Sequence, residues 1–304
     1  MNKRFTVLFA LTALFAVTAM GQPASVFKVF ANKGAVELKS GETRQPLKTG
    51  AALKSEDQII VCEGCYVALV HSTTGKPQQL TSAGTYAVKD LASKVTGNSG
   101  VVSKYTEFIL SSNSDEAKRN RLSATGAVHR GLNDIDVFLP DPRSHGNHVM
   151  GDSVVVAWES KTSKQGPYEI ELKNMFGDAL QKVQTSESKV KIALPAKVDI
   201  VTLEVRRKGE SASNIPQFSI QRFNPEKDKA TIQKIKAELA ELNLSEETAI
   251  NKFILAGFYE YQNLLIDAIS AYEHAIRLAP DVDTYKEAYN EFLLRKQLKD
   301  AKPQ

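Results

Sequence analysis

The chain has 304 residues, of which 42% are hydrophobic and 24% charged, a composition typical of a soluble protein that buries sizeable cores. The formal net charge is +4, with 39 basic and 35 acidic side chains, and it falls to +2 when Lys3 and Arg4, in a segment expected to be removed, are left out. So small a charge argues against a nucleic-acid-binding surface. Two cysteines and five histidines leave little material for a metal site. We therefore expect no cofactor, no metal and no nucleic-acid partner.

Residues 1–21 have the pattern of a cleavable signal peptide. Lys3 and Arg4 form a short positive region, and Phe5–Met20 is an uncharged, mostly apolar run. That run is shorter than the roughly 20 residues that a membrane-spanning helix needs. We expect cleavage before Gln22 and export to the periplasm of a Gram-negative bacterium or the medium, without stable membrane insertion. An uncleaved membrane anchor is the alternative.

Residues 22–110 are expected to form a first, β-rich domain. Short apolar runs alternate with turn signals and predict strands at Val26–Phe30, Ala35–Leu38, Gln58–Cys62, Tyr66–Ser72 and Thr85–Val88. Strands this close together along the chain predict a small antiparallel β roll.

Glycines and leucines recur through this region, together with one acidic residue. They are Gly34, Leu47, Gly50, Leu53, Asp57, Leu69, Gly75 and Leu80. This layout resembles the FecR-type β domain of bacterial envelope proteins, over about 65 residues of the sequence. The resemblance implies a protein-interaction or scaffold module and not a catalytic one.

Cys62 and Cys65 form a C-x-x-C motif between two predicted strands, with Glu63-Gly64 as the turn that joins them. Redox motifs of this kind usually open a helix, whereas neighbours on either side of a tight turn come within disulfide distance. We expect a disulfide across a β-hairpin. Free thiols, a redox pair or half of a metal site are the alternatives.

Residues 111–145 are expected to form a linker or irregular segment. The strings at residues 97–100 and 151–153 are similar to serine-nucleophile motifs, but neither has the strand-to-helix context that exposes such a serine. His145 and His148, with nearby aspartates at 134, 136 and 141, form the best metal candidate, although surface histidines in a loop are the preferred interpretation. No catalytic residue is predicted.

Residues 146–222 are expected to form a small β-sandwich. The predicted strands are Val154–Trp158, Tyr168–Leu172, Leu180–Thr185, Val190–Ala193, Thr202–Arg206 and Gln217–Gln221. A strand that ends in Trp158, followed by alternation from Tyr168, resembles immunoglobulin-like or fibronectin-type sandwiches, without the immunoglobulin disulfide.

Residues 223–304 are rich in Ala, Leu, Glu and Lys and predict helices at Glu226–Leu242, after a cap at Ser245, and at Val282–Leu298. Small and aromatic residues recur at Leu255, Ala256, Tyr259, Ala268, Tyr272, Ala275 and Pro280. This spacing resembles a tetratricopeptide (TPR) repeat, except that Lys252 stands where a large apolar residue is usual. The resemblance implies a helical hairpin packed through these seven residues, with the two flanking helices as neighbours or caps.

If the repeat geometry holds, one face of this hairpin forms a concave protein-binding groove. The residues that would line it are Ile250, Phe253, Gly257, Glu260 and Tyr261. The competing interpretation is that these residues pack against the helix at Glu226–Leu242.

Together these patterns predict a multidomain β + α protein, in which a β roll, a β-sandwich and TPR-like helices follow one another. We expect an exported, non-enzymatic adaptor or scaffold of the bacterial cell envelope that binds other envelope proteins. The alternative is a periplasmic sensor or a protein that binds cell-wall glycan or a small ligand. Exposed aromatics clustered on one sheet face would favour that alternative, whereas an aromatic-poor sheet face with a grooved helical domain would favour the adaptor. A hydrolase is the third hypothesis.

Overall fold

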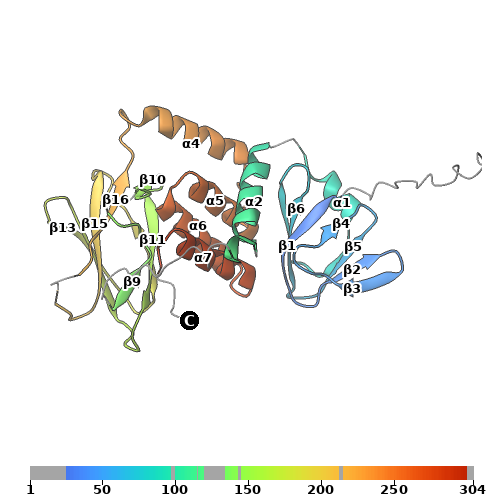
Figure 1. Ribbon diagram of the computed structural model, residues 1–304, viewed down its shortest axis with the longest axis horizontal. Helices are drawn as coiled ribbons and strands as arrows, with labels where there is room; N and C mark the ends of the chain where they lie inside the picture. The colour runs from blue at the N-terminus through green and yellow to red at the C-terminus, as the bar shows by residue number, and fades with distance from the viewer. Residues whose placement is uncertain are drawn as a thin grey trace, which may run out of the picture.

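The computed structural model describes residues 25–96, 100–114, 116–119, 134–142, 145–211 and 215–299. The chain has mixed β and α structure, with several antiparallel sheets in its N-terminal two-thirds and helices towards the C-terminus. Most of the helices lie at the centre of the molecule, between one β unit on each side, whereas α1 (Val88–Ser93) lies with the N-terminal β unit (Figure 1). The predicted signal peptide, residues 1–21, lies outside the described residues.

The N-terminal β unit contains two four-stranded antiparallel sheets, with strand orders β4-β1-β6-β7 and β3-β2-β5-β8. The strands are β1 (Phe27–Lys33), β2 (Glu37–Ser40), β3 (Thr43–Pro46), β4 (Ala52–Leu53), β5 (Gln58–Val61), β6 (Tyr66–His71), β7 (Pro77–Leu80) and β8 (Gly84–Ala87). All five predicted strands occur at shifted boundaries. The short strands β3, β4 and β7 were not predicted.

Cys62 and Cys65 lie at disulfide distance, with a Cα–Cα separation of 5.2 Å, as the predicted pairing requires. The predicted hairpin is wrong, because β5 and β6 belong to different sheets. The Cys65 amide donates to the Cys62 carbonyl at 3.1 Å, so the turn exists, but it carries the chain from one sheet to the other. Gly34 lies against it, where an added Cβ would clash with Cys65 Sγ.

The sheet β4-β1-β6-β7 is covered on both faces. Val29, Val67 and Leu69 pack towards the second sheet, in the core of the β unit. Phe30, at a bulge in β1, and Tyr66 instead join the core that includes the helices. This double coverage is why the first five residues of β6 are all buried and apolar, without the alternation of a half-exposed strand.

The central β unit pairs a five-stranded sheet, ordered β10-β16-β15-β12-β13, with a three-stranded sheet, ordered β14-β11-β9. Its strands are β9 (Ile135–Val137), β10 (His148–Val149), β11 (Ser153–Ser160), β12 (Tyr168–Lys173), β13 (Ala179–Thr185), β14 (Lys189–Ala193), β15 (Ile200–Arg207) and β16 (Phe218–Arg222). All six predicted strands are present. Trp158 is buried against Tyr168, with ring centroids 5.2 Å apart.

The sequence predicts a linker or irregular segment at residues 111–145, but part of this segment is a strand. The segment contains β9, which pairs antiparallel with β11 through Ile135 and Ser160. The central β unit therefore begins before residue 146.

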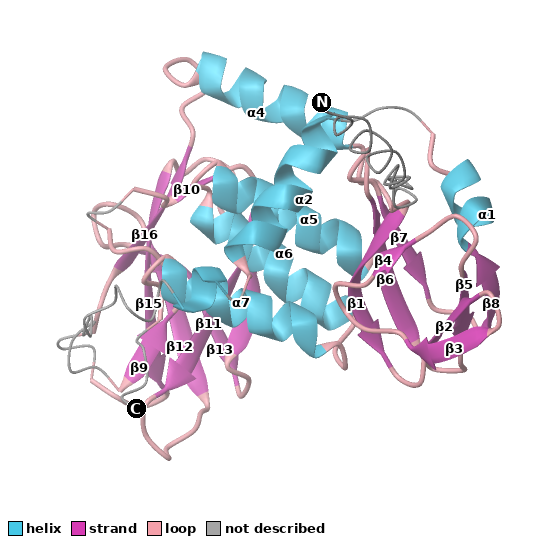
Figure 2. Cartoon of the chain, turned by 45° about the vertical axis from the view of Figure 1, so that its right-hand side comes forward, coloured by secondary structure: helices cyan, strands magenta, loops and turns pink. Residues whose placement is uncertain are grey.

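The helices are α1 (Val88–Ser93), α2 (Gly100–Ser112), α4 (Lys229–Leu242), α5 (Ala249–Tyr261), α6 (Leu265–Leu278) and α7 (Asp283–Arg295). Thr248, and not Ser245 as predicted, caps α5, by accepting a hydrogen bond from the Asn251 amide. Helix α2 packs between α4 and α5, so the predicted neighbour α4 is displaced by a helix from far upstream in the chain (Figure 2).

One contiguous apolar core joins the helices, the central β unit and one face of the N-terminal sheet. A second core fills the space between the two N-terminal sheets. None of the helices among the described residues is long and apolar enough to cross a membrane.

Candidate functional site

Helix α2 covers the face of α5 on which the sequence predicts a groove. Val102, Tyr105 and Ile109 of α2 are at most 1% exposed. An added Cβ on Gly257 would lie 3.1 Å from Ile109 Cβ, so the glycine allows the two helices to approach closely. The face of α5 on which a groove was predicted is thus covered by another helix of the same chain.

Four of the five predicted groove residues are interior residues. Ile250 and Phe253 are 1% and 0% exposed. Phe253 packs against Phe30 of the N-terminal β unit, with ring centroids 4.8 Å apart, and not against α4. These positions do not form an open groove, which corrects the prediction.

Glu260 is a structural link between helices. Its carboxylate is 1% exposed and accepts hydrogen bonds from Arg295 Nε and Nη2, both at 3.0 Å. Tyr272 donates to the same carboxylate at 3.3 Å. A buried carboxylate satisfied in this way ties α5, α6 and α7 together and is closed to an external ligand.

The residues predicted to pack the helical hairpin lie largely in its interior. Ala256, Ala268, Tyr272 and Ala275 are each 0% exposed. Leu255 and Tyr259 are half-buried, and Pro280 is exposed just after α6 ends. The hairpin α5–α6 is therefore present, with α7 packed on α6.

Helix α2 is the element that the sequence interpretation missed. Its buried residues Val102, Tyr105 and Ile109 follow i, i+3, i+7 spacing, which is the pattern of one helix face. That spacing could have predicted the helix. Its partner, α5, is about 150 residues away in sequence, and local periodicity carries no information about such a distant contact.

The fifth groove residue, Tyr261, is 49% exposed and belongs to a surface that we call the α2 patch, formed by Lys104, Phe108 and Tyr261. The Phe108 and Tyr261 rings meet edge to face at 5.3 Å. Lys104 Nζ lies 4.3 Å from the centre of the Tyr261 ring, in a cation–π contact. The patch therefore combines aromatic area with a positive charge.

Tyr105 fixes the floor of the patch. Its ring packs against that of Tyr261 at 5.4 Å, and its hydroxyl donates to Glu238 of α4 and accepts from Gln262 at 3.1 Å. Burial raises the pKa of the Tyr105 hydroxyl well above its ordinary value, and the hydrogen bond to Glu238 raises it further. The phenol stays neutral and acts as a structural bridge between α2, α4 and α5.

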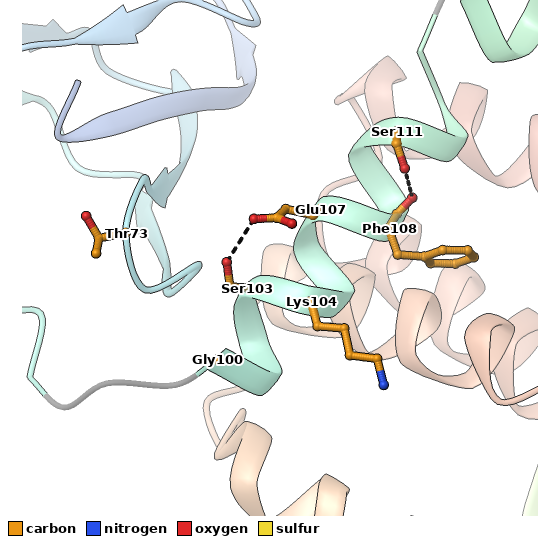
Figure 3. A pocket seen from close by; sticks show the side chains of 7 residues that line it. All are labelled: Thr73, Gly100, Ser103, Lys104, Glu107, Phe108 and Ser111. Carbon is orange, nitrogen blue, oxygen red and sulfur yellow. Dashed lines mark hydrogen bonds between the residues drawn. The ribbon is translucent and has the colours of Figure 1, made fainter. Parts of the chain in front are cut away.

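An open hollow of about 640 Å³ runs along the exposed side of α2 and is lined by Thr73, Gly100, Ser103, Lys104, Glu107, Phe108 and Ser111. Figure 3 shows that Ser103 and Glu107 point towards the side of Thr73, whereas Lys104 and Phe108 point to the other side of the helix. Ser103 donates to Glu107 at 3.1 Å. Because the lining side chains diverge, the hollow does not present them to one small substrate.

The outward face of the five-stranded sheet carries a ladder of ion pairs. Arg206 of β15 pairs with Glu169 and Glu171 of β12, and Lys173 pairs with Glu204 at 2.8 Å. The hydrogen bond from Arg206 lowers the pKa of the Glu169 carboxyl. This face is charged and internally paired.

The predicted metal candidate is not assembled in the part of the chain that the structure describes, where no group of three or more His, Cys, Asp or Glu could hold an ion. The His148 ring packs on Phe223 at 4.8 Å. Asp152 pairs with Arg222 at 2.8 Å, and Ser153 begins β11.

No protein-family model matches the chain, and no curated protein matches it significantly. The FecR and TPR resemblances therefore remain predictions from sequence patterns.

Proposed function

We propose that this protein is an exported, non-enzymatic scaffold of the bacterial cell envelope that binds other envelope proteins. The signal-like pattern of residues 1–21 supports export. The FecR-like and TPR-like spacings support a protein-interaction role, as both types of module bind other proteins.

The observation that carries the proposal is the α2 patch. Tyr261 is half exposed, and Phe108 and Lys104 hold its ring in place from one side. Rigid aromatic side chains with a polar tip are enriched at the energetic centres of protein interfaces, because they bury large area at low entropic cost. We therefore propose that the partner-binding surface lies on α2 and the end of α5, and not on the face of α5 that α2 covers.

The outward sheet face favours this function over glycan binding. Aromatic platforms there would support stacking of sugar rings, but β12 and β15 present charged side chains such as Glu171 and Arg206. This face therefore lacks the aromatic cluster that would favour glycan binding, whereas the open helical groove that would favour a scaffold is absent from α5.

Site-specific photo-crosslinking in cells tests the proposed surface. A photoreactive amino acid at position 261 is expected to crosslink a defined partner, whereas the same group at Lys229, on the exposed side of α4, is not. The double variant Lys104→Ala/Phe108→Ala should reduce the crosslink at 261 while the circular dichroism spectrum stays unchanged. Equal crosslinking at both positions would contradict the proposal.

Export is tested separately by the intact mass of the protein recovered from the periplasm or the medium. We expect a mature chain that starts at Gln22. Retention of residues 1–21 would contradict cleavage.

A further inference from the structure

Strand β13 (Ala179–Thr185) is the open edge of the five-stranded sheet. It pairs with β12 on one side and has no strand on its other side. Its seven residues include one charged side chain, Lys182, and most of them are exposed. An edge of this kind presents unpaired backbone N–H and C=O groups in a row, which is a template for another strand.

The other sheet edges of the described chain are blunted in the ways that proteins commonly use. Strand β3 carries Arg44 and Pro46, and β7 begins with Pro77. Strand β14 carries Lys189 and Lys191. Strands β4, β9 and β10 have two or three residues, and β8 has four before α1 begins. Strand β13 therefore stands apart as a long edge with little charge.

The hairpin that leads into β13 also concentrates exposed apolar surface. Met175 and Phe176 in its turn are 68% and 82% exposed, and Leu180 is 37% exposed. Only five large hydrophobic side chains are exposed in the described residues, and three of them belong to this hairpin. Exposed apolar side chains gathered in this way mark an interaction surface.

The turn holds these side chains in place. Asn174 Oδ1 accepts hydrogen bonds from the amides of Phe176 and Asp178, both at 2.9 Å. The Asn174 amide in turn donates to the Asp178 carbonyl at 3.0 Å. The turn is thus organised before any partner binds, which lowers the entropic cost of association.

We propose that β13 pairs antiparallel with β13 of a second copy of this chain, so that the two five-stranded sheets become one continuous sheet. This proposal does not depend on the proposed function. A two-fold axis perpendicular to the sheet makes the interface self-complementary, as in most homodimers.

Among registers centred at residues 181–183, in the middle of β13, the charge pattern favours one. Symmetry places one residue opposite its own copy, and a centre at Lys182 would set two ammonium groups face to face, which destabilises a strand pair. A centre at Gln181 would set Lys182 against the apolar Leu180. A centre at Val183 places Val183 opposite itself, Lys182 opposite Gln184 of the second copy, and Gln181 opposite Thr185 of the second copy.

The Val183-centred register also accounts for the apolar hairpin. Continued beyond the strand, it sets residues 178–180 opposite residues 186–188 of the second copy, so the turn with Met175 and Phe176 lies at that end of the interface. One interface then covers both the open strand edge and the exposed apolar side chains.

Cysteine crosslinking tests the register directly. Val183→Cys should form a covalent dimer under mild oxidation, because directly opposed side chains in an antiparallel pair have Cβ atoms about 4.5–5.5 Å apart. Gln181→Cys alone should stay monomeric on a non-reducing gel, whereas a mixture of Gln181→Cys and Thr185→Cys should crosslink. Equal crosslinking of Val183→Cys and Gln181→Cys would overturn the register.

Sedimentation velocity of the purified protein tests the dimer without a crosslink. Gln184→Lys places like charges opposite Lys182 twice in each dimer and should raise the dimer Kd at least about tenfold. Gln184→Glu should lower it. The matched control is Gln45→Lys on the edge strand β3, which should leave the Kd unchanged.

A wild-type chain that stays monomeric up to about millimolar concentration would overturn the proposal. It would leave β13 available to an extended segment of a different protein. A dimer insensitive to both Gln184 variants would overturn it as well, since the contact would then lie elsewhere.

Discussion

The two β units attach to the central helices through different chemistry. The N-terminal unit uses aromatic side chains: the Phe30 and Phe253 rings are 4.8 Å apart, and the Tyr66 and Tyr285 hydroxyls share a hydrogen bond of 2.6 Å. The central unit shares an apolar core with the helices and adds polar contacts with α6. Asp267 accepts hydrogen bonds from the amides of Met150 and Gly151, at 2.8 and 3.2 Å.

This difference determines which conditions each attachment responds to. Burial of apolar area does not depend on pH, so the aromatic contact should hold across a wide pH range. The polar contact depends on a carboxyl that is 5% exposed, and burial raises the pKa of Asp267 to about 6. Both attachments thus depend on packing, and the central one adds a contact that is sensitive to protonation.

The largest effect is expected from Phe253→Ala. Phe253 is 0% exposed and contacts Phe30, Tyr272 and Tyr285. Removal of a buried phenyl ring typically lowers the free energy of unfolding by about 3–5 kcal/mol. Urea unfolding measures the change. Phe176→Ala, at an 82% exposed position, is the matched control and, in protein dilute enough to be monomeric, should change stability by less than about 0.5 kcal/mol. Similar losses for both variants would contradict the role of the aromatic attachment.

A pH-dependent effect is expected from Asp267→Asn. The folded-state pKa of about 6 lies above the ordinary 3.8, so this group contributes stability that is complete below pH 3.8 and is lost as the pH rises through 6. The shift corresponds to about 3 kcal/mol between those limits. Unfolding free energies measured from pH 4 to 7 should therefore fall less steeply in the variant than in the wild type.

Asp281→Asn is the control for this pH series. Asp281 pairs with Lys33, which lowers the pKa of the Asp281 carboxyl, so it is already ionised over the range measured. This variant should keep the wild-type slope. A wild-type slope in Asp267→Asn would show that the polar attachment does not titrate there.

A smaller effect is expected from Tyr66→Phe. The substitution keeps the ring but removes the hydroxyl that bonds to Tyr285 and to Gln79. It leaves the buried Tyr285 hydroxyl without this partner, at a cost of about 1–3 kcal/mol. In a double-mutant cycle, Tyr285→Phe should cost less in the Tyr66→Phe background than alone. Additive effects in chemical denaturation would rule out coupling across the attachment.

The smallest effect is expected from Lys33→Ala. Lys33 and Asp281 join the N-terminal unit to the loop before α7 at 2.8 Å, but their side chains are 41% and 71% exposed. Exposed ion pairs gain little, because water and salt screen them. We expect no measurable change in the urea midpoint. A clear loss would show that the attachment is not mainly aromatic.

The strands and helices with a strong local period could be predicted from sequence. All six strands predicted for the central unit are present, and so is the helical hairpin marked by Ala256, Ala268 and Tyr272. Short strands such as β4 and β10 were missed because two residues carry no readable period. The hairpin expected around Cys62 and Cys65 was wrong, since a tight turn can join strands of different sheets.

The candidate site was only partly predictable. Of the predicted groove residues, Tyr261 lies on the surface, whereas Phe253 and Glu260 have partners within the chain. A repeat pattern indicates which face of a helix is apolar, but it does not indicate what covers that face.

The sequence by itself determined most of the longer strands, the hairpin of α5 and α6 and the alternation of β and α regions, because these follow from periods and spacings of a few residues. Only the tertiary structure decided that α2 fills the face of α5, that most of the helices lie between the two β units, and that β13 remains an open edge. These features depend on which apolar surfaces meet across more than a hundred residues of chain. Complementary shape and burial decide such contacts, and no local pattern encodes them.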